Sequence, residues 1–474
     1  MFDELLIASV GVFSVSLLIS MLAGRQTLGG TARGYLFSGN NPWLATSSNV
    51  GSMLSIAVVF TLYVVLVSGY GLRFVLAVAV GLTLGHAFLY WRLNKLASAP
   101  DRDMDAYRGS TILALARERG VNATLPILFQ YILPIVLEYT VLLACIRGVL
   151  GETSSGFLSS GFLVAALVAF LCATYTSTGG FRGILRTDLF QGGVFVAAFL
   201  FLVSTNWTEV SGVLAPSNLG RHDEPVPVLA WLTVVLFTGA AYSAYPDIFV
   251  RNFSSLSLQK GVKLWWLPLS FTLMLVALVP LTLLGLFMVE SEGIPLVFDP
   301  KATLDFFIRE FRDWASSPDY SLGVWLVVSG FLCMFITTID TWLVGLMQHF
   351  RGNRRVAELR LLPYLVSGAC LMVALCLHSK HVLLVGLITF PFLFYDCLLL
   401  VLVTTTAEAA QRWARFAKVG LGAGLLAYAG SCWFFRADLE ANAYLVILYC
   451  AIAVALGVLI PFLFVTVSKR LKNE

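Results

Sequence analysis

The chain has 474 residues, of which 58% are hydrophobic and only 12% charged, and its mean hydropathy is +0.85. Ordinary globular domains carry about 25% charged residues, so this composition excludes a soluble enzyme, a disordered chain and a nucleic-acid-binding protein. The formal net charge of +4 says little by itself, because in a membrane protein the sidedness of Lys and Arg carries the information.

Apolar segments long enough to cross a bilayer recur along nearly the whole chain, at about 20 residues per crossing. They lie at about 5–24, 44–68, 72–96, 124–149, 159–178, 188–206, 227–249, 264–289, 322–346, 361–378, 383–405, 418–435 and 441–467. The intervening polar stretches are too short to form an independent core. The sequence therefore predicts an all-α polytopic membrane protein with about 13 transmembrane helices in one membrane domain, 1–474.

The basic residues predict the orientation of the chain in the bilayer. Alternate loops, all on one face, hold 23 of the 31 Lys and Arg residues. Basic loops face the cytoplasm, so we predict that the carboxy terminus is cytoplasmic and the amino terminus outside. Segment 5–24 follows two acidic residues and no basic region, so it is predicted to be a true helix and not a cleaved signal. We expect an integral protein of a bacterial inner membrane.

Two of the apolar segments contain polar or helix-breaking residues. Segment 44–68 opens with the polar run 46–49, and segment 227–249 contains Gly239, Tyr242 and Pro246. Two interrupted helices at corresponding places in two halves indicate a transporter built from inverted repeats, in which unwound backbone carbonyls bind a cation. The alternative is that these residues only pack or kink the helices.

Four stretches resemble the sodium/solute symporter family, which includes sodium-coupled proline, sugar, sialic acid and monocarboxylate carriers. They are the Tyr-Leu-Phe-Ser-Gly run at 35–39 with Pro42-Trp43, the Gly-Gly…Thr-Asp…Gln run at 179–191, the Pro-Asp-Ile-Phe-Val-Arg run from 246, and Phe-Ile-Thr-Thr-Ile-Asp-Thr at 335–341. The resemblance implies a five-plus-five inverted-repeat core of the amino acid transporter type, working by alternating access. Residues 44–206 would form the first repeat and 227–405 the second, with 5–24 a leading helix and 418–467 two peripheral helices.

The resemblance also implies a main sodium site. Its ligands would be the backbone carbonyls of Gly51, Leu54 and Met334 and the hydroxyls of Thr337 and Thr338. Sodium is a hard cation, so a cage of oxygen atoms suits it. Alternatively, the two threonine hydroxyls bond to carbonyls one turn earlier and only pack.

A second, inner sodium site is implied by Asp188, Asp340 and Thr341, since some family members bind another ion there. Asp340 and Thr341 lie one helical turn after Thr337, on the same face. A carboxylate inside a membrane is functional by default, because burying a charge is expensive without a partner. The competing interpretation is an ion pair with Arg182, Arg186 or Arg251.

The solute is expected between the two interrupted helices. The candidate solute-binding residues are Ser55, Val58, Glu138, Tyr242, Tyr245, Tyr395 and Asp396. Glu138 and Asp396 lie well inside their helices, where each would fix a cationic group or relay a proton, or else cap a broken helix or pair with Arg147 or His86. Sugar carriers of the family tend to have a polar side chain where this chain has Val58, so the resemblance disfavours a sugar and favours an amino acid or a carboxylate.

We therefore predict sodium-coupled symport of a small organic solute, with sodium and lipid as the other partners and no nucleic acid. The sequence contains no HExxH or GxSxG motif, so no enzymatic activity is expected. The alternative is a transporter-like receptor or accessory subunit that binds a solute, or a signalling partner, without transport.

Overall fold

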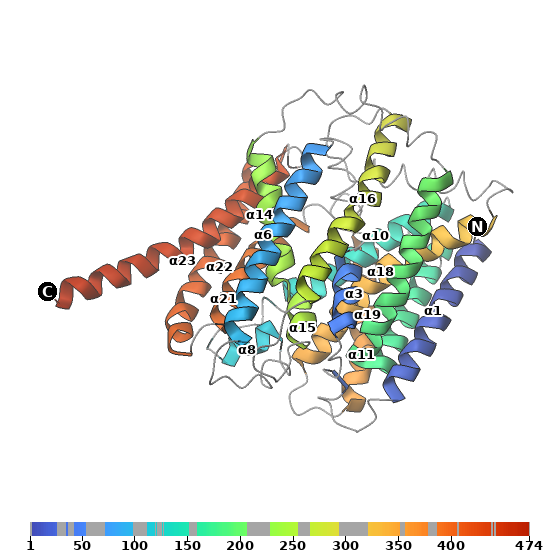
Figure 1. Ribbon diagram of the computed structural model, residues 1–474, viewed down its shortest axis with the longest axis horizontal. Coiled ribbons are helices and arrows are strands. Elements are labelled where there is room, and N and C mark those ends of the chain that lie inside the picture. Colours follow the sequence, from blue (N-terminus) through green and yellow to red (C-terminus); the bar gives the residue numbers. More distant parts are fainter. Residues whose placement is uncertain are drawn as a thin grey trace. The chain divides into compact units, whose positions relative to one another are not determined.

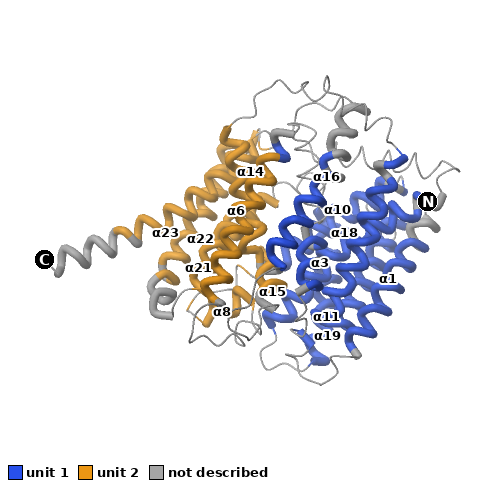
Figure 2. Tube along the Cα trace, in the orientation of Figure 1, with its two compact units in different colours: residues 1–75, 131–225, 265–382 blue, residues 76–130, 226–264, 383–474 orange. Residues whose placement is uncertain are grey.

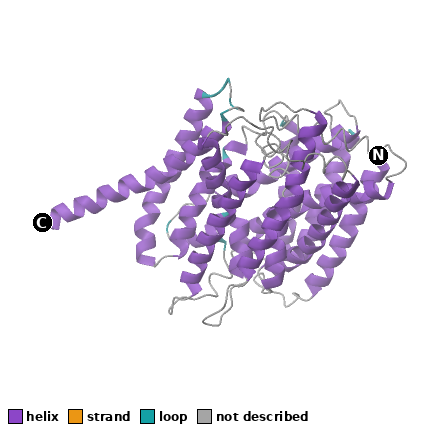
Figure 3. Ribbon diagram, turned by 45° about the horizontal axis from the view of Figure 1, so that its top comes forward, coloured by secondary structure: helices purple, strands orange, loops and turns teal. Residues whose placement is uncertain are grey.

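In a computed structural model of the chain, almost all of the described residues are helical, and no strand occurs among them (Figures 1 and 3). The described residues are 2–25, 35–36, 42–53, 72–97, 111–118, 120, 126, 128–150, 159–205, 228–254, 266–292, 321–350, 356–377, 386–404, 407–437, 439 and 442–473. The chain divides into two compact units (Figure 2). Unit 1 comprises residues 1–75, 131–225 and 265–382, and unit 2 comprises 76–130, 226–264 and 383–474.

Within the described residues, seven helices are long and apolar enough to cross a membrane. Three shorter apolar helices, Val228–Ala244, Trp266–Val279 and Thr389–Thr404, fall in segments that the sequence also predicts to cross. The predicted segments and the helices agree closely at the leading helix, at 72–96 and at 322–346. The latter part of 44–68 lies outside the described residues. All eight cysteines lie among the described residues, and none of them forms a disulfide.

Unit 1 is built around one long helix. Its helices are α1 (Phe2–Arg25), α3 (Pro42–Met53), α10 (Leu133–Leu150), α11 (Ser160–Thr205), α16 (Trp266–Glu292), α18 (Ser321–His349) and α19 (Val356–Cys376). Helix α11 packs against all the others in the unit. Helix α18 is the most enclosed of the seven candidate spans, with 89% of its apolar window buried. Side chains on α18 therefore face protein and not lipid.

Helix α11 is interrupted at a single residue, Gly180. Its 46 residues would extend about 70 Å as one straight helix, roughly twice the thickness of a bilayer core. Gly180 has φ 57° and ψ −158°, a conformation that only glycine adopts readily. The sequence predicts two crossings here, joined by a cytoplasmic loop at 180–187. The structure differs, because the helix resumes at Phe181 and the break is confined to Gly180.

Tyr35, which precedes α3, forms a hydrogen bond with α11 directly before this break. A non-helical Gly180 leaves carbonyls of the preceding turn without their usual amide donors. The Tyr35 hydroxyl donates to the Ser177 carbonyl and lies 3.4 Å from the Thr176 carbonyl. The Arg360 guanidinium of α19 lies 5.3 Å from the centre of the Tyr35 ring. The tyrosine thus supplies the hydrogen bond that the helix loses at its break.

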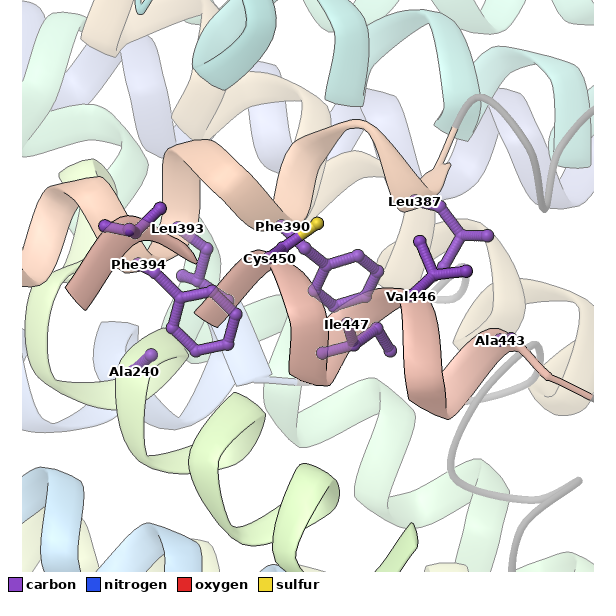
Figure 4. Close-up of a cluster of buried hydrophobic side chains, with 10 residues drawn as sticks. Ala240, Leu387, Phe390, Leu393, Phe394, Ala443, Val446, Ile447 and Cys450 are labelled. Carbon is purple, nitrogen blue, oxygen red and sulfur yellow. The ribbon is translucent and has the colours of Figure 1, made fainter. Parts of the chain in front are cut away.

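Unit 2 contains α6 (Leu72–Ala97, from residue 76 on), α8 (Ile112–Glu118), α14 (Val228–Ala244), α15 (Pro246–Ser254), α21 (Thr389–Thr404), α22 (Ala407–Phe434) and α23 (Ala443–Asn473). A hydrophobic cluster joins α14, α21 and α23 (Figure 4). It consists of Ala240, Leu387, Phe390, Leu393, Phe394, Ala443, Val446, Ile447, Cys450 and Val454. The helices that follow the predicted second repeat are therefore packed onto α14 and α21 and not isolated.

The interruption predicted in segment 227–249 is present. Helix α14 ends at Ala244, Tyr245 is not helical, and α15 begins at Pro246. Proline has no backbone N–H and its ring disfavours a helical residue before it, so the local sequence explains the break. The Tyr245 carbonyl nevertheless accepts a hydrogen bond from the Phe249 amide at 3.0 Å. The break is therefore short, and α15 follows directly.

A buried arginine holds the last turn of α21. Arg92 of α6 is 2% exposed, and its Nε donates to the Thr404 hydroxyl at 2.7 Å. Its terminal nitrogen donates to the Val401 carbonyl at 3.0 Å. Carbonyls of the last helical turn lack intrahelical donors, and a positive charge is favourable there. Arg92 therefore both caps α21 and joins it to α6.

We expect Arg92→Ala to destabilise the purified protein by about 2–4 kcal/mol, because a buried hydroxyl and a carbonyl lose a charged donor. The measurement is the midpoint of thermal unfolding in detergent. Arg436→Ala is the matched control, because Arg436 is exposed and lies over the exposed Trp433 ring at 5.0 Å. Equal midpoints for the two variants would contradict a capping role for Arg92.

Candidate cation and solute sites

The two threonines of the main sodium site are buried on α18. Thr337 is 2% and Thr338 7% exposed, so neither faces lipid. The Thr337 hydroxyl donates to the carbonyls of Cys333 and Met334, both at 3.1 Å. The Thr338 hydroxyl donates to the Met334 carbonyl at 3.2 Å. These are the bonds of the packing interpretation, but each hydroxyl keeps two lone pairs that can coordinate a cation.

The other half of that site is on α3, which packs against α18 within unit 1. Helix α3 is regular at Gly51 and continues to Met53, so the expected interruption does not fall at Gly51. A Cβ on Gly51 would lie 3.6 Å from the Cβ of Asp188 on α11. Gly51 therefore lies against the predicted inner-site acid. Leu54, the remaining carbonyl ligand, lies outside the described residues.

The polar opening of α3 is used in contacts between helices. The Ser48 hydroxyl donates to the Asp188 carboxylate of α11. The Thr46 hydroxyl approaches the Trp266 carbonyl, and the Asn49 amide approaches the Ser270 hydroxyl of α16, both at 3.4 Å. Polar side chains join transmembrane helices in this way in general. The polar run 46–49, which indicated a broken helix, therefore also sets the orientation of α3 about its own axis relative to α11 and α16.

The inner-site acids are both fully buried, with 0% exposure. Asp188 accepts the Ser48 hydroxyl, and Asp340 accepts the Tyr175 hydroxyl of α11. The Thr341 hydroxyl donates to the Thr337 carbonyl at 2.8 Å and lies 3.3 Å from an Asp340 oxygen. Each carboxylate therefore has a hydroxyl donor from a neighbouring helix. Sequence reasoning missed Ser48 as a partner and Tyr175 altogether.

Metal binding by acids, imidazoles and thiols is not indicated in the described part of the chain. No group of three or more His, Cys, Asp or Glu side chains there is arranged to hold a metal ion. The candidate cation sites instead combine hydroxyl, carbonyl and single carboxylate oxygens. Such a donor set suits a hard monovalent cation better than a transition metal.

The solute-binding candidates are divided between the two units. Glu138 lies on α10 in unit 1 and is 3% exposed. In unit 2, the ring of Tyr242 stacks on His86 of α6 with 6.3 Å between centroids, and Tyr245 occupies the helix break. Ser55 and Val58 lie outside the described residues.

Tyr395 and Asp396 are buried in the middle of α21, with 1% and 0% exposure. Asp396 accepts a hydrogen bond of 2.5 Å from the side-chain amide of Gln130. Gln130 lies in a π-helical turn, η2 (Leu128–Ile132), directly before α10. Sequence reasoning missed Gln130, although a lone amide inside the apolar run 126–137 is a signal that a search for buried polar residues would find.

Comparison with solved structures identifies the architecture. The chain is similar to a Na+-coupled sialic acid symporter solved substrate-bound and outward-open, with a TM-score of 0.64 and 16% identity over 96% of this chain and 97% of that one. It is also similar to Mhp1, a nucleobase-cation-symport-1 family transporter in a closed conformation with bromovinylhydantoin bound, with a TM-score of 0.51 and 12% identity over 90% and 93%.

The fold is that of an inverted-repeat membrane transporter. At 16% and 12% identity the likeness shows the fold alone, and it confirms the expected all-α, polytopic architecture. No protein-family model matches the chain, and the search of curated proteins found no match. The chain is thus an integral membrane protein with this all-α fold.

Proposed function

We propose that the chain is a sodium-coupled secondary transporter of the sodium/solute symporter family, carrying a small organic solute inward by alternating access. The observation that supports this most is the likeness to a Na+-coupled symporter over 96% of the chain. The buried threonine pair on α18, beside α3, is the second support. Catalysis has no comparable support in the described residues.

Sodium entry supplies enough free energy for this work. One positive charge moving down a potential of about 100 mV releases roughly 2.3 kcal/mol, which concentrates a coupled solute more than tenfold. We propose Gly51, Leu54, Met334, Thr337 and Thr338 as the main sodium site. Asp188, Asp340 and Thr341 would form the inner one, and the structure of the sialic acid symporter likewise reveals a novel Na+ site in that protein.

The proposal includes the arrangement of the chain in the membrane. Residues 44–206 and 227–405 would be the two inverted repeats, with the amino terminus outside and the carboxy terminus in the cytoplasm of a bacterial cell. The excess of basic residues in one set of loops supports this orientation. The solute would be an amino acid or a carboxylate in preference to a sugar, and Glu138, Tyr242, Tyr245, Tyr395 and Asp396 are the described residues proposed to meet it.

We expect purified protein in liposomes to accumulate its solute only when sodium is higher outside. The measurement is uptake across a panel of labelled amino acids, short carboxylates and sugars. Each is tested with an inward sodium gradient and with an equal potassium gradient, at the same membrane potential.

Equal uptake in sodium and potassium would contradict sodium coupling. Saturable binding of a solute without any accumulation would favour the receptor or accessory subunit instead. Protein-free liposomes give the leak that both measurements must exceed.

A further inference from the structure

The π-helical turn η2 contains Gln130, whose side-chain amide forms a hydrogen bond with the buried carboxylate of Asp396. A π-helical turn inserts an extra residue into the helix and is frequent at functional sites. In η2 it accompanies two contacts with α21 of unit 2. The rings of Phe129 and Phe392 stack with 4.6 Å between centroids, and the amide Nε2 of Gln130 donates to Asp396.

Hydrogen bonds fix which way the Gln130 amide points. Nε2 lies 2.5 Å from the Asp396 carboxylate and 3.5 Å from the Phe392 carbonyl, and both of these groups accept hydrogen bonds. Reversing the amide would set its oxygen against two other oxygens. The amide nitrogen therefore faces α21, and the amide oxygen Oε1 faces away from these acceptors.

This oxygen is buried without a hydrogen-bond donor. Gln130 is 1% exposed, and its Oε1 has no partner. A buried acceptor left in this way costs about 1–3 kcal/mol, so its presence calls for an explanation. A ligand donor that reaches it is one such explanation.

Two other buried glutamines, Gln191 and Gln348, also leave Oε1 without a partner. Their Nε2 atoms bond to neutral groups, the Ser16 hydroxyl at 3.2 Å and the Leu36 carbonyl at 2.9 Å. Gln130 differs because its amide bonds to a carboxylate. Of these three glutamines, only Gln130 places an open acceptor beside a negative charge.

We propose that Gln130 and Asp396 form a subsite for the protonated amino group of the transported solute. This inference rests on the function proposed above and narrows its solute class. The amide oxygen and the carboxylate accept hydrogen bonds, and an ammonium group has three to donate. Hydrogen bonds between charged partners are about twice as strong as neutral ones, and apolar surroundings such as the Phe129–Phe392 pair strengthen them further. A solute carboxylate would be repelled here, so it must be held elsewhere.

The test uses the full chain in detergent with sodium present. Each common amino acid, its N-acetyl derivative and the matching amine without a carboxylate are used as probes. The readout is the rise in the midpoint of thermal unfolding as a function of probe concentration. We expect at least one free amino acid or amine to stabilise the protein and its N-acetyl derivative to have no effect.

Two variants locate the effect. Asp396→Asn keeps an oxygen for the Gln130 amide but removes the charge, and Gln130→Met keeps the length but removes both polar atoms. Each is expected to weaken binding of the amine tenfold or more, without lowering the midpoint of the unliganded protein as strongly as the loss of a core residue would. Gln348→Met is the matched control, and its amine affinity should equal that of the wild type.

Unchanged amine affinity in both Asp396→Asn and Gln130→Met would overturn the subsite. So would sodium-driven uptake confined to solutes without an amino group, which leaves the proposed transport function standing. Stabilisation by sodium alone that disappears in Asp396→Asn would also overturn it, because the charge would then hold the metal ion. Amine binding that depends on both Gln130 and Asp396, without sodium-driven uptake, would instead contradict the proposed transport function and support the subsite.

Discussion

Replacing Gly180 by alanine is expected to destabilise the chain by about 2–6 kcal/mol, the largest stability effect that we expect from adding a single methyl group. One part of the cost is the backbone. Gly180 has φ 57° and ψ −158°, and holding a residue with a Cβ there costs about 1–3 kcal/mol. The other part is overlap, because the new Cβ would collide with the Tyr35 carbonyl oxygen and lie 2.9 Å from its ring. Overpacking of this kind costs about 1–3 kcal/mol more.

Tyr35 cannot move aside cheaply. Its hydroxyl bonds to the Ser177 carbonyl, and the Arg360 guanidinium stacks on its ring. Displacing the ring would therefore remove the donor that replaces the helix hydrogen bond at the break. We expect Gly180→Ala to lower both the yield of monodisperse protein and the midpoint of thermal unfolding in detergent.

Gly192→Ala is the matched control on the same helix. A Cβ on Gly192 meets nothing within 4 Å, and its φ is not positive. Alanine is favoured over glycine in a helix by about 1 kcal/mol, so this variant should be as stable as the wild type or slightly more stable. A Gly180→Ala protein as stable as the Gly192→Ala protein would show that α11 does not need its break.

Much of the fold was predictable because hydropathy is a local signal. The apolar segments gave the helices, and Pro246 explained where segment 227–249 is interrupted. The break in α11 was predicted as a loop of eight residues, 180–187, which contains the polar Arg182, Arg186 and Thr187, whereas the structure has these residues in a helix and Thr187 fully buried, with 0% exposure. A window that averages hydropathy cannot distinguish a polar loop from a helix whose polar side chains have partners inside the protein.

The residues of the candidate sites were predictable from the sequence, but the hydrogen-bond pairs that they form were not. Buried Asp188, Asp340 and Asp396 were each identified, because a carboxylate in an apolar segment is conspicuous. Their donors, which are Ser48, Tyr175 and Gln130, lie more than 130 residues away in the sequence. Which donor meets which acid depends on how each helix is rotated in the packed unit, and a single sequence does not contain that information.

Removing the hydroxyl of Thr338 is expected to weaken sodium binding by about tenfold to a hundredfold. The side chain is buried on α18, and its hydroxyl donates to the Met334 carbonyl at 3.2 Å. That bond uses the proton and leaves the lone pairs for a cation. An interaction of a neutral polar group with a charge contributes about 1.5–3 kcal/mol, which corresponds to the expected loss of affinity. Thr338→Ser keeps the oxygen, so it should bind sodium nearly as well as the wild type.

The measurement is the sodium concentration that gives half-maximal solute uptake in proteoliposomes, together with sodium-dependent thermal stabilisation of the purified protein. Thr282→Ala on α16 is the matched control, because Thr282 is 8% exposed and its hydroxyl donates to the Leu278 carbonyl one turn earlier at 2.7 Å. If the hydroxyls on α18 only pack, Thr338→Ala and Thr282→Ala should lose similar stability and keep the same sodium dependence. A selective loss of sodium affinity in Thr338→Ala, rescued by serine, is the result that separates an ion ligand from a threonine that merely bonds to its own helix.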